Sequence, residues 1–173
     1  MTHPFRFGVS GGALTDPHDV VALAVRAEEL GYDTVAISDH LDDGCAPLVA
    51  LMAAAMATER IRLATLVLAN DFRNPTVLAK ELATLDVISR GRLEWGIGAG
   101  WKTTDYEKGS IDLDRPGIRI ARLAESIAVI KQCFSDGEFS FTGEHYSVKN
   151  LDGLPKPVQR PHPPLMIAGG GPK

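Results

Sequence analysis

The residues best suited to acid–base chemistry are an aspartate and a histidine that follow one another. Asp39 and His40 come directly after Asp33–Ser38, an apolar segment that predicts a buried β-strand. Histidine changes its charge near neutral pH, so His40 can donate or accept a proton, and the adjacent carboxylate can orient another group. The alternative is structural: Asp39 caps the next helix and His40 lies in a loop. The position of the pair leaves both interpretations open.

Glycine-rich turns follow two other apolar segments. Gly96–Gly100 continues from Leu93, and Gly169–Gly171 follows Leu165–Ala168. The first turn lacks the Gly-x-Gly-x-x-Gly spacing of a dinucleotide-binding turn. Its alternate glycines let a flat ligand approach the backbone, or let a strand bend at a barrel corner. The second turn offers backbone N–H groups to a phosphate, unless it is only a flexible linker.

The remaining polar groups give weaker signals. A solvated acidic loop, rather than a set of paired catalytic carboxylates, is predicted for Asp105, Glu107, Asp112 and Asp114. Cys45 and Cys133 lack the spacing of a metal or redox pair. They are predicted to be buried free thiols.

The elements that position these residues alternate between strand and helix. Strands are predicted at Phe5–Ser10, Asp33–Ser38, Ile61–Leu68, Leu93–Ile97 and Leu165–Ala168. Capping residues, prolines and terminal glycines predict a helix from Pro17 that Gly31 closes, and further helices at Ala46–Thr58, Pro75–Ser89 and Pro116–Phe134. Before the last strand, Glu138–Val148 predicts a β-hairpin and Leu151–Pro164 a proline-rich connector.

Strands that alternate with helices predict an α/β fold in which the strand ends share one face. A complete (βα)8 barrel has about 250 residues, whereas this chain has 173. We therefore expect a single domain, 1–173, that is a (βα)8 TIM barrel truncated after its fifth strand. The hairpin and the connector form an insertion at about 137–164 in this interpretation.

The composition is that of an ordinary soluble globular protein, with 45% apolar residues, 23% charged residues and a net charge of −4. The mild acidity argues against a nucleic-acid footprint, which needs a basic face. The longest apolar run, Cys45–Ala57, is too short to span a bilayer and suits a buried helix. Because Met1–Arg6 has no signal-peptide pattern, we expect a cytoplasmic protein.

Several segments together resemble the bacterial luciferase-like monooxygenase superfamily, and within it the coenzyme F420-dependent oxidoreductases of actinobacteria. These segments are Val35–His40, Leu63–Asn70, Arg73–Asp86, Gly91–Trp101 and Leu165–Gly171. The resemblance implies a barrel that binds the deazaflavin ring at the carboxyl ends of its strands. A hydride would then pass between F420 and a small organic substrate, with His40 as general acid or base and Asp39 as the residue that orients it.

The resemblance also implies the residues that contact the cofactor. They are Asp39, His40, Thr65, Leu66, Val67, Asn70, Gly98, Ala99, Gly100, Ala168, Gly169, Gly170 and Gly171. Leu66-Val67 matches a bulge in the third strand that often carries a non-prolyl cis peptide in that family. Relatives that oxidise a sugar phosphate have a glutamate where this chain has Trp101, so we expect Trp101 to contact a more hydrophobic substrate.

Two alternatives to an F420-dependent enzyme stay open. The first is an FMN-dependent luciferase-like monooxygenase, which the sequence distinguishes poorly from an F420 enzyme. The second is a non-catalytic flavin-binding protein or an inactive barrel fragment, because part of the barrel is missing. The expected partners are a small-molecule substrate and a second copy of the chain in a homodimer, without nucleic acid, membrane or metal.

Overall fold

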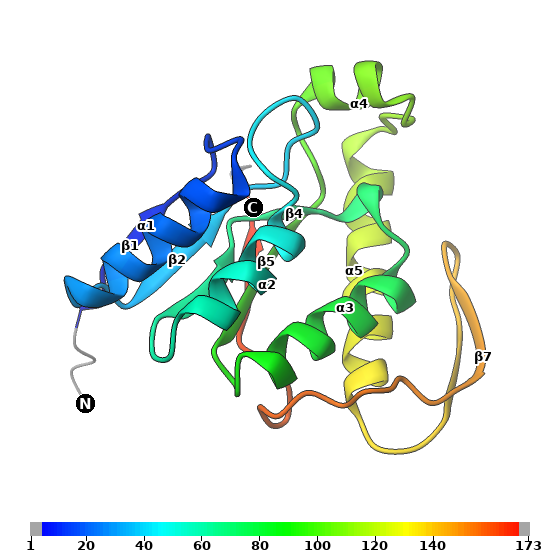
Figure 1. The fold of residues 1–173 in the computed structure, drawn as a ribbon. Coiled ribbons are helices and arrows are strands. Elements are labelled where there is room, and N and C mark those ends of the chain that lie inside the picture. The colour runs from blue at the N-terminus through cyan, green and yellow to red at the C-terminus, as the bar shows by residue number, and fades with distance from the viewer. Residues whose placement is uncertain (1–4, 170–173) are drawn as a thin grey trace.

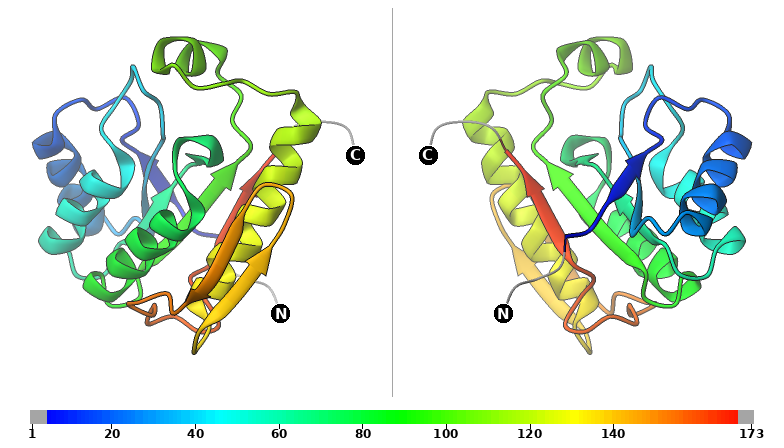
Figure 2. Two further views of the ribbon diagram at one scale, coloured as in Figure 1. Left: turned by 90° about the vertical axis from the view of Figure 1, so that its right-hand side faces the viewer. Right: turned by 90° about the vertical axis from the view of Figure 1, so that its left-hand side faces the viewer.

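Short apolar segments form a parallel sheet in the order in which they occur in the chain. In the computed structural model, which describes residues 5–169, the strands of this sheet are β1 (Gly8–Ser10), β2 (Thr34–Ile37), β3 (Arg62–Thr65), β4 (Leu68–Ala69), β5 (Leu93–Gly98) and β8 (Leu165–Ala168). β3 and β4 lie end to end along one edge of β5, and β8 pairs with β5 as well. The arrowheads of the strands point to one common end of the sheet, near the green helix α4 (Figure 2).

Four long helices connect the strands. They are α1 (Pro17–Glu29), α2 (Pro47–Ala57), α3 (Pro75–Ile88) and α5 (Pro116–Phe134), and each begins with a proline. Asp16 and Asn74 cap α1 and α3 by accepting backbone N–H groups. Gly31, with a φ of 81°, follows α1 in the left-handed conformation that the sequence predicts. The helices lie on the outer side of the sheet (Figures 1 and 2).

The hydrophobic core lies between the sheet and these helices. Alternate residues of β2, β3 and β5 point into it, and Trp95 of β5 meets Phe134 of α5 edge to face with ring centroids 6.3 Å apart. The Trp95 indole donates a hydrogen bond to the carbonyl of Pro163, which ties the connector to the sheet. Cys45 and Cys133 are buried free thiols, as predicted.

The segment before β8 has the predicted hairpin and connector. β6 (Phe139–Thr142) and β7 (Ser147–Leu151) pair antiparallel beside α5. The connector then returns to the start of β8 without regular structure. Asp86, which is fully buried, accepts hydrogen bonds from the backbone N–H groups of Val158 and Gln159 and so fixes the connector against α3.

The structure differs from the sequence-based prediction in two segments. The predicted strand Ile61–Leu68 is divided into β3 and β4, and the 3-10 helix η1 (Asn70–Phe72) follows β4. The peptide between Leu66 and Val67, at this division, is cis, in agreement with the family resemblance. The predicted acidic loop contains the short helix α4 (Thr103–Gly109). Among the helices that the structure describes, none combines the length and the apolar character needed to cross a membrane.

Candidate functional site

The carboxyl ends of β2, β4, β5 and β8 surround a cavity of about 820 Å³. This volume lies in the range of sites for cofactors and drug-sized ligands. Its lining includes ten of the residues that the sequence analysis assigned to the site: Asp39, His40, Leu66, Val67, Gly98, Ala99, Gly100, Trp101, Ala168 and Gly169. Segments that are far apart in the sequence therefore meet at one rim, as the βα alternation predicts.

Asp39 is held in place by hydrogen bonds from β4 and from the segment that follows β4. Its carboxylate, 6% exposed, accepts hydrogen bonds from both terminal nitrogens of Arg73, at 2.6 and 3.1 Å. It also accepts one from the backbone N–H of Ala69, at 3.0 Å. The N-cap residue of helix α2 is Ala46, so the alternative in which Asp39 caps that helix is wrong.

His40 contacts a different carboxylate. Its Nδ1 atom lies 2.7 Å from Oδ2 of Asp105, a residue of α4 that is 2% exposed. The His40 ring also meets Trp101 edge to face, with centroids 6.1 Å apart. Two predictions are thereby corrected: Asp105 is buried and not part of a solvated loop, and the carboxylate in contact with His40 is Asp105, not Asp39.

The three alternate glycines of β5 and its turn have three different surroundings. A Cβ atom at Gly96 would lie 2.5 Å from the carbonyl oxygen of Thr65, so Gly96 is required for strand packing. Gly100 has a φ of 78° and faces the ring of Tyr106. At Gly98, the nearest atoms, Cγ2 of Val67 and Cβ of Ala168, are at ordinary contact distances of 3.4 and 3.5 Å. A methyl group at Gly98 would therefore make ordinary contacts with these two residues, and Gly98 itself lines the cavity.

Some of the predicted cofactor residues lie elsewhere. Thr65, which is fully buried, accepts a hydrogen bond from the N–H of Gly96 and donates one to the Gly96 carbonyl. It therefore joins two strands and does not line the cavity. Asn70 borders a separate, smaller cavity of about 220 Å³, and among residues 5–169 its side-chain amide has no hydrogen-bond partner. Gly170 and Gly171 lie outside the described residues.

Tyr106 forms part of the cavity wall, although no sequence motif marked it as a site residue. Its hydroxyl donates a hydrogen bond to Oδ2 of Asp71 at 3.0 Å, and its ring is 2% exposed. Burial and the negative charge of Asp71 raise the pKa of Tyr106 to about 12. Asp71 in turn accepts a hydrogen bond from Arg122 of α5 at 2.8 Å. A fixed polar network therefore supports the cavity on the side of α5.

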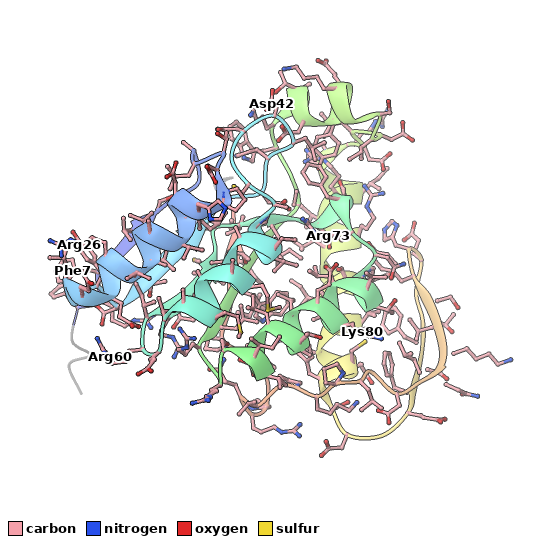
Figure 3. All side chains as sticks on the ribbon, in the orientation of Figure 1. Phe7, Arg26, Asp42, Arg60, Arg73 and Lys80 are labelled. Atoms are coloured by element: carbon pink, nitrogen blue, oxygen red, sulfur yellow. The ribbon has the colours of Figure 1, made fainter. Side chains whose placement is uncertain are left out.

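Ion pairs connect α4 to the loop that follows His40. Asp42, labelled on that loop in Figure 3, accepts hydrogen bonds from Nζ of Lys102 and of Lys108 at 2.8 and 2.7 Å. The hydrogen bonds to these two lysines lower the pKa of Asp42. Arg119 donates to the carbonyl oxygens of Ala99 and Gly100. The two basic side chains of the cavity lining, Lys102 and Arg119, are thus already engaged within the chain.

Comparison with known proteins identifies the chain. Residues 1–173 match the family model for the luciferase-like monooxygenase. The chain belongs to this family. Over 164 residues it is 36% identical to the F420-dependent glucose-6-phosphate dehydrogenase of Amycolatopsis mediterranei, an alignment that covers 90% of this chain and 49% of the relative. The chain spans about half the length of the curated relatives it matches.

Solved structures of luciferase-like proteins confirm the fold. The monooxygenase RslO1 from Streptomyces bottropensis is 28% identical, with a TM-score of 0.85 over 94% of this chain and 53% of that one. An F420-dependent secondary alcohol dehydrogenase, solved with an F420-acetone adduct, is 24% identical and has a TM-score of 0.85 over 95% of this chain and 52% of that one. The parallel sheet therefore corresponds to part of a luciferase-like TIM barrel, as predicted.

Proposed function

We propose that the chain is the N-terminal part, within a single barrel domain, of an F420-dependent oxidoreductase. The observation that carries this proposal is the meeting of His40, Val67 and Gly98 around one cavity. A mostly apolar lining beside a histidine suits a deazaflavin ring. The relatives named F420-dependent glucose-6-phosphate dehydrogenase support the choice of cofactor.

The residues of this chain would supply binding and proton transfer. Bound F420 would supply the carbon that accepts or releases the hydride. If the substrate is an alcohol, His40 would take the hydroxyl proton as the hydride leaves the adjacent carbon, which yields a carbonyl product. In the opposite direction His40 would return that proton. General acid–base catalysis of this kind contributes about 10² to 10⁴ in rate.

We further propose that the substrate is hydrophobic. Trp101 is 76% exposed at the cavity, and Leu66 and Ile120 add apolar surface there. Lys102 and Arg119 are occupied by Asp42 and by backbone carbonyls, so neither is free for a substrate phosphate. This favours an apolar alcohol or carbonyl compound over the sugar phosphate in the names of the relatives.

The second candidate is an FMN-dependent monooxygenase. It is supported by the similarity to the monooxygenase RslO1, at 28% identity and a TM-score of 0.85. The same cavity lining suits an isoalloxazine ring as well as a deazaflavin. Binding data are therefore needed to separate the two cofactors.

The homodimer stays a prediction, and helix α2 gives it physical support. This helix contains no charged residue, yet it exposes 71% of Val49 and 75% of Met56. A helix that is apolar on all sides is normally buried. A second copy of the chain that covers Val49 and Met56 would bury this face.

Titration with both cofactors tests the proposed function. The 173-residue chain is titrated with F420 and with FMN while their absorbance is followed, and we expect binding of F420. His40→Ala should retain F420 binding but lower turnover of a hydrophobic alcohol by about 10² to 10⁴. His18→Ala, a change at an exposed position of α1, is the matched control and should change neither property.

Three results would contradict the proposal. Tight FMN binding without F420 binding would favour the monooxygenase. Binding of neither cofactor would favour an inactive barrel fragment. Turnover by His40→Ala at the wild-type rate would remove His40 from proton transfer.

A further inference from the structure

The contact between His40 and Asp105 joins two elements that are far apart in the chain. Asp105 lies in the first turn of α4, and His40 lies in the loop after β2. The carboxylate is 2% exposed, and its Oδ2 atom lies 2.7 Å from Nδ1 of His40. Burying a carboxylate without partners is costly. The contact is therefore a specific pairing and not a chance approach at the surface.

The two oxygens of Asp105 have separate partners. Oδ2 faces His40, whereas Oδ1 accepts the backbone N–H of Leu41 at 3.3 Å and lies 3.7 Å from Nζ of Lys102. The other carboxylate next to the histidine, Asp39, is occupied by Arg73 and by Ala69. Among the described residues, Asp105 is thus the hydrogen-bonded carboxylate of His40.

This arrangement decides which ring nitrogen carries the proton. An ionised carboxylate can only accept hydrogen bonds, so Nδ1 of the neutral His40 must be the N–H donor. Nε2 then keeps its lone pair. His40 lines the cavity, and among residues 5–169 Nε2 has no hydrogen-bond partner. The lone pair is therefore free for a proton from a ligand.

We propose that Asp105 is a positioning residue that fixes neutral His40 as the Nδ1–H tautomer, with Nε2 as the proton acceptor of the cavity. The structural part of this inference concerns the chain alone. Its consequence for the reaction rests on the proposed function. A carboxylate that holds a catalytic histidine in the correct tautomer can be worth as much as about 10⁴ in kcat.

Asparagine at this position should reverse the tautomer. The Asn carbonyl oxygen is expected to stay on the Leu41 N–H and near Lys102, because both require an acceptor. The Asn amide group would then face Nδ1 of His40 as a donor. His40 would have to carry its proton on Nε2, so the lone pair would be lost from the cavity.

Nitrogen NMR of the 15N-histidine-labelled chain measures this directly. At about pH 8, where histidine is ordinarily neutral, the wild type should give a protonated Nδ1 and an unprotonated Nε2 for His40. The signals are assigned by their absence in His40→Gln. In Asp105→Asn the two nitrogens should exchange roles. Asp42→Asn is the matched control, because it removes the partner of Lys102 and Lys108 without touching His40, and its tautomer should stay Nδ1–H.

The wild-type spectrum tests the inference even if a variant does not fold. A neutral His40 with its proton on Nε2 in the wild type would overturn the proposal, and so would an unchanged tautomer in folded Asp105→Asn. In the F420-loaded enzyme, Asp105→Asn should lower kcat by about 10² to 10⁴ with little change in cofactor affinity, and Asp105→Glu should restore part of it. An Nδ1–H wild type that fails to bind F420 would contradict the proposed function and leave the role of Asp105 intact.

Discussion

Replacing Gly100 by alanine should cost more than its backbone conformation alone explains. A residue with a side chain pays about 1 to 2 kcal/mol in the left-handed region, and Gly100 has a φ of 78°. Its new Cβ atom would also collide with the hydroxyl of Tyr106 and lie 2.8 Å from Cζ of that ring. Tyr106 would have to move away from Asp71, and a lost hydrogen bond to a buried charged group adds about 1 to 3 kcal/mol. We therefore expect a total loss of about 2 to 5 kcal/mol.

Gly31 provides a matched control for the backbone cost. It has a φ of 81°, and no atom lies within 4 Å of the position of its Cβ. Gly31→Ala should therefore lose only about 1 to 2 kcal/mol. The free energy of unfolding is measured by urea denaturation of the wild type and both variants.

A double-mutant cycle identifies the source of the extra cost at Gly100. In a Tyr106→Ala background the ring is absent, so Gly100→Ala should cost no more than Gly31→Ala. An equal loss for Gly100→Ala with and without the Tyr106 ring would refute the reasoning. Equal losses at Gly100 and Gly31 in the wild-type background would refute it as well.

Two further variants test the cavity wall. Gly98→Ala should change the free energy of unfolding by less than about 0.5 kcal/mol, because the new methyl group would make ordinary contacts with Val67 and Ala168. The same variant should bind F420 more weakly in a titration. Unchanged affinity would contradict a ring at Gly98. Tyr106 has a folded-state pKa of about 12, above its ordinary value of 10.0, so its contribution to stability is present below pH 10 and is lost as the pH rises toward 12. Phenylalanine has no hydroxyl to ionise, so the stability of Tyr106→Phe does not fall in this way. The difference in free energy of unfolding between wild type and variant should therefore change by about 2 to 3 kcal/mol between pH 9 and pH 12. A constant difference would contradict the raised pKa.

Local signals in the sequence account for most of the fold. The caps Asp16 and Asn74 act on N–H groups only two residues away, and Gly31 depends on its own φ. Such features need no knowledge of the tertiary structure. The alternation of strands and helices then determines that the strand ends share one face, which is why His40 and Gly98 could be assigned to the same site.

The resemblance to a family did not indicate which individual side chains line the cavity. Thr65 and Asn70 follow from the same motif as Leu66 and Val67, but they do not line the cavity. Side chains along a strand alternate between its two faces, so membership in a motif does not determine which face a residue occupies.

The role of Asp105 could not be predicted because it depends on a contact across the fold. α4 spans only Thr103–Gly109, too short for a helical repeat of apolar residues, and its polar composition is typical of a loop. One signal was available: Tyr106 is an apolar neighbour that a solvated loop would not need. A buried aromatic residue brings its neighbours close to the core, and this is how Asp105 becomes buried with it.

The division of tasks between Asp39 and His40 also has a geometric cause. In an extended chain, successive side chains point to opposite sides. Asp39 accordingly contacts Ala69 and Arg73 on the side of the next strand, whereas His40 contacts Asp105 on the side of α4. Two neighbours of this kind are poorly suited to bind each other, but they can tie two different elements to one rim. Asp39 thus fixes the loop to the sheet, and His40 stays available for a ligand because its orienting carboxylate comes from elsewhere in the chain.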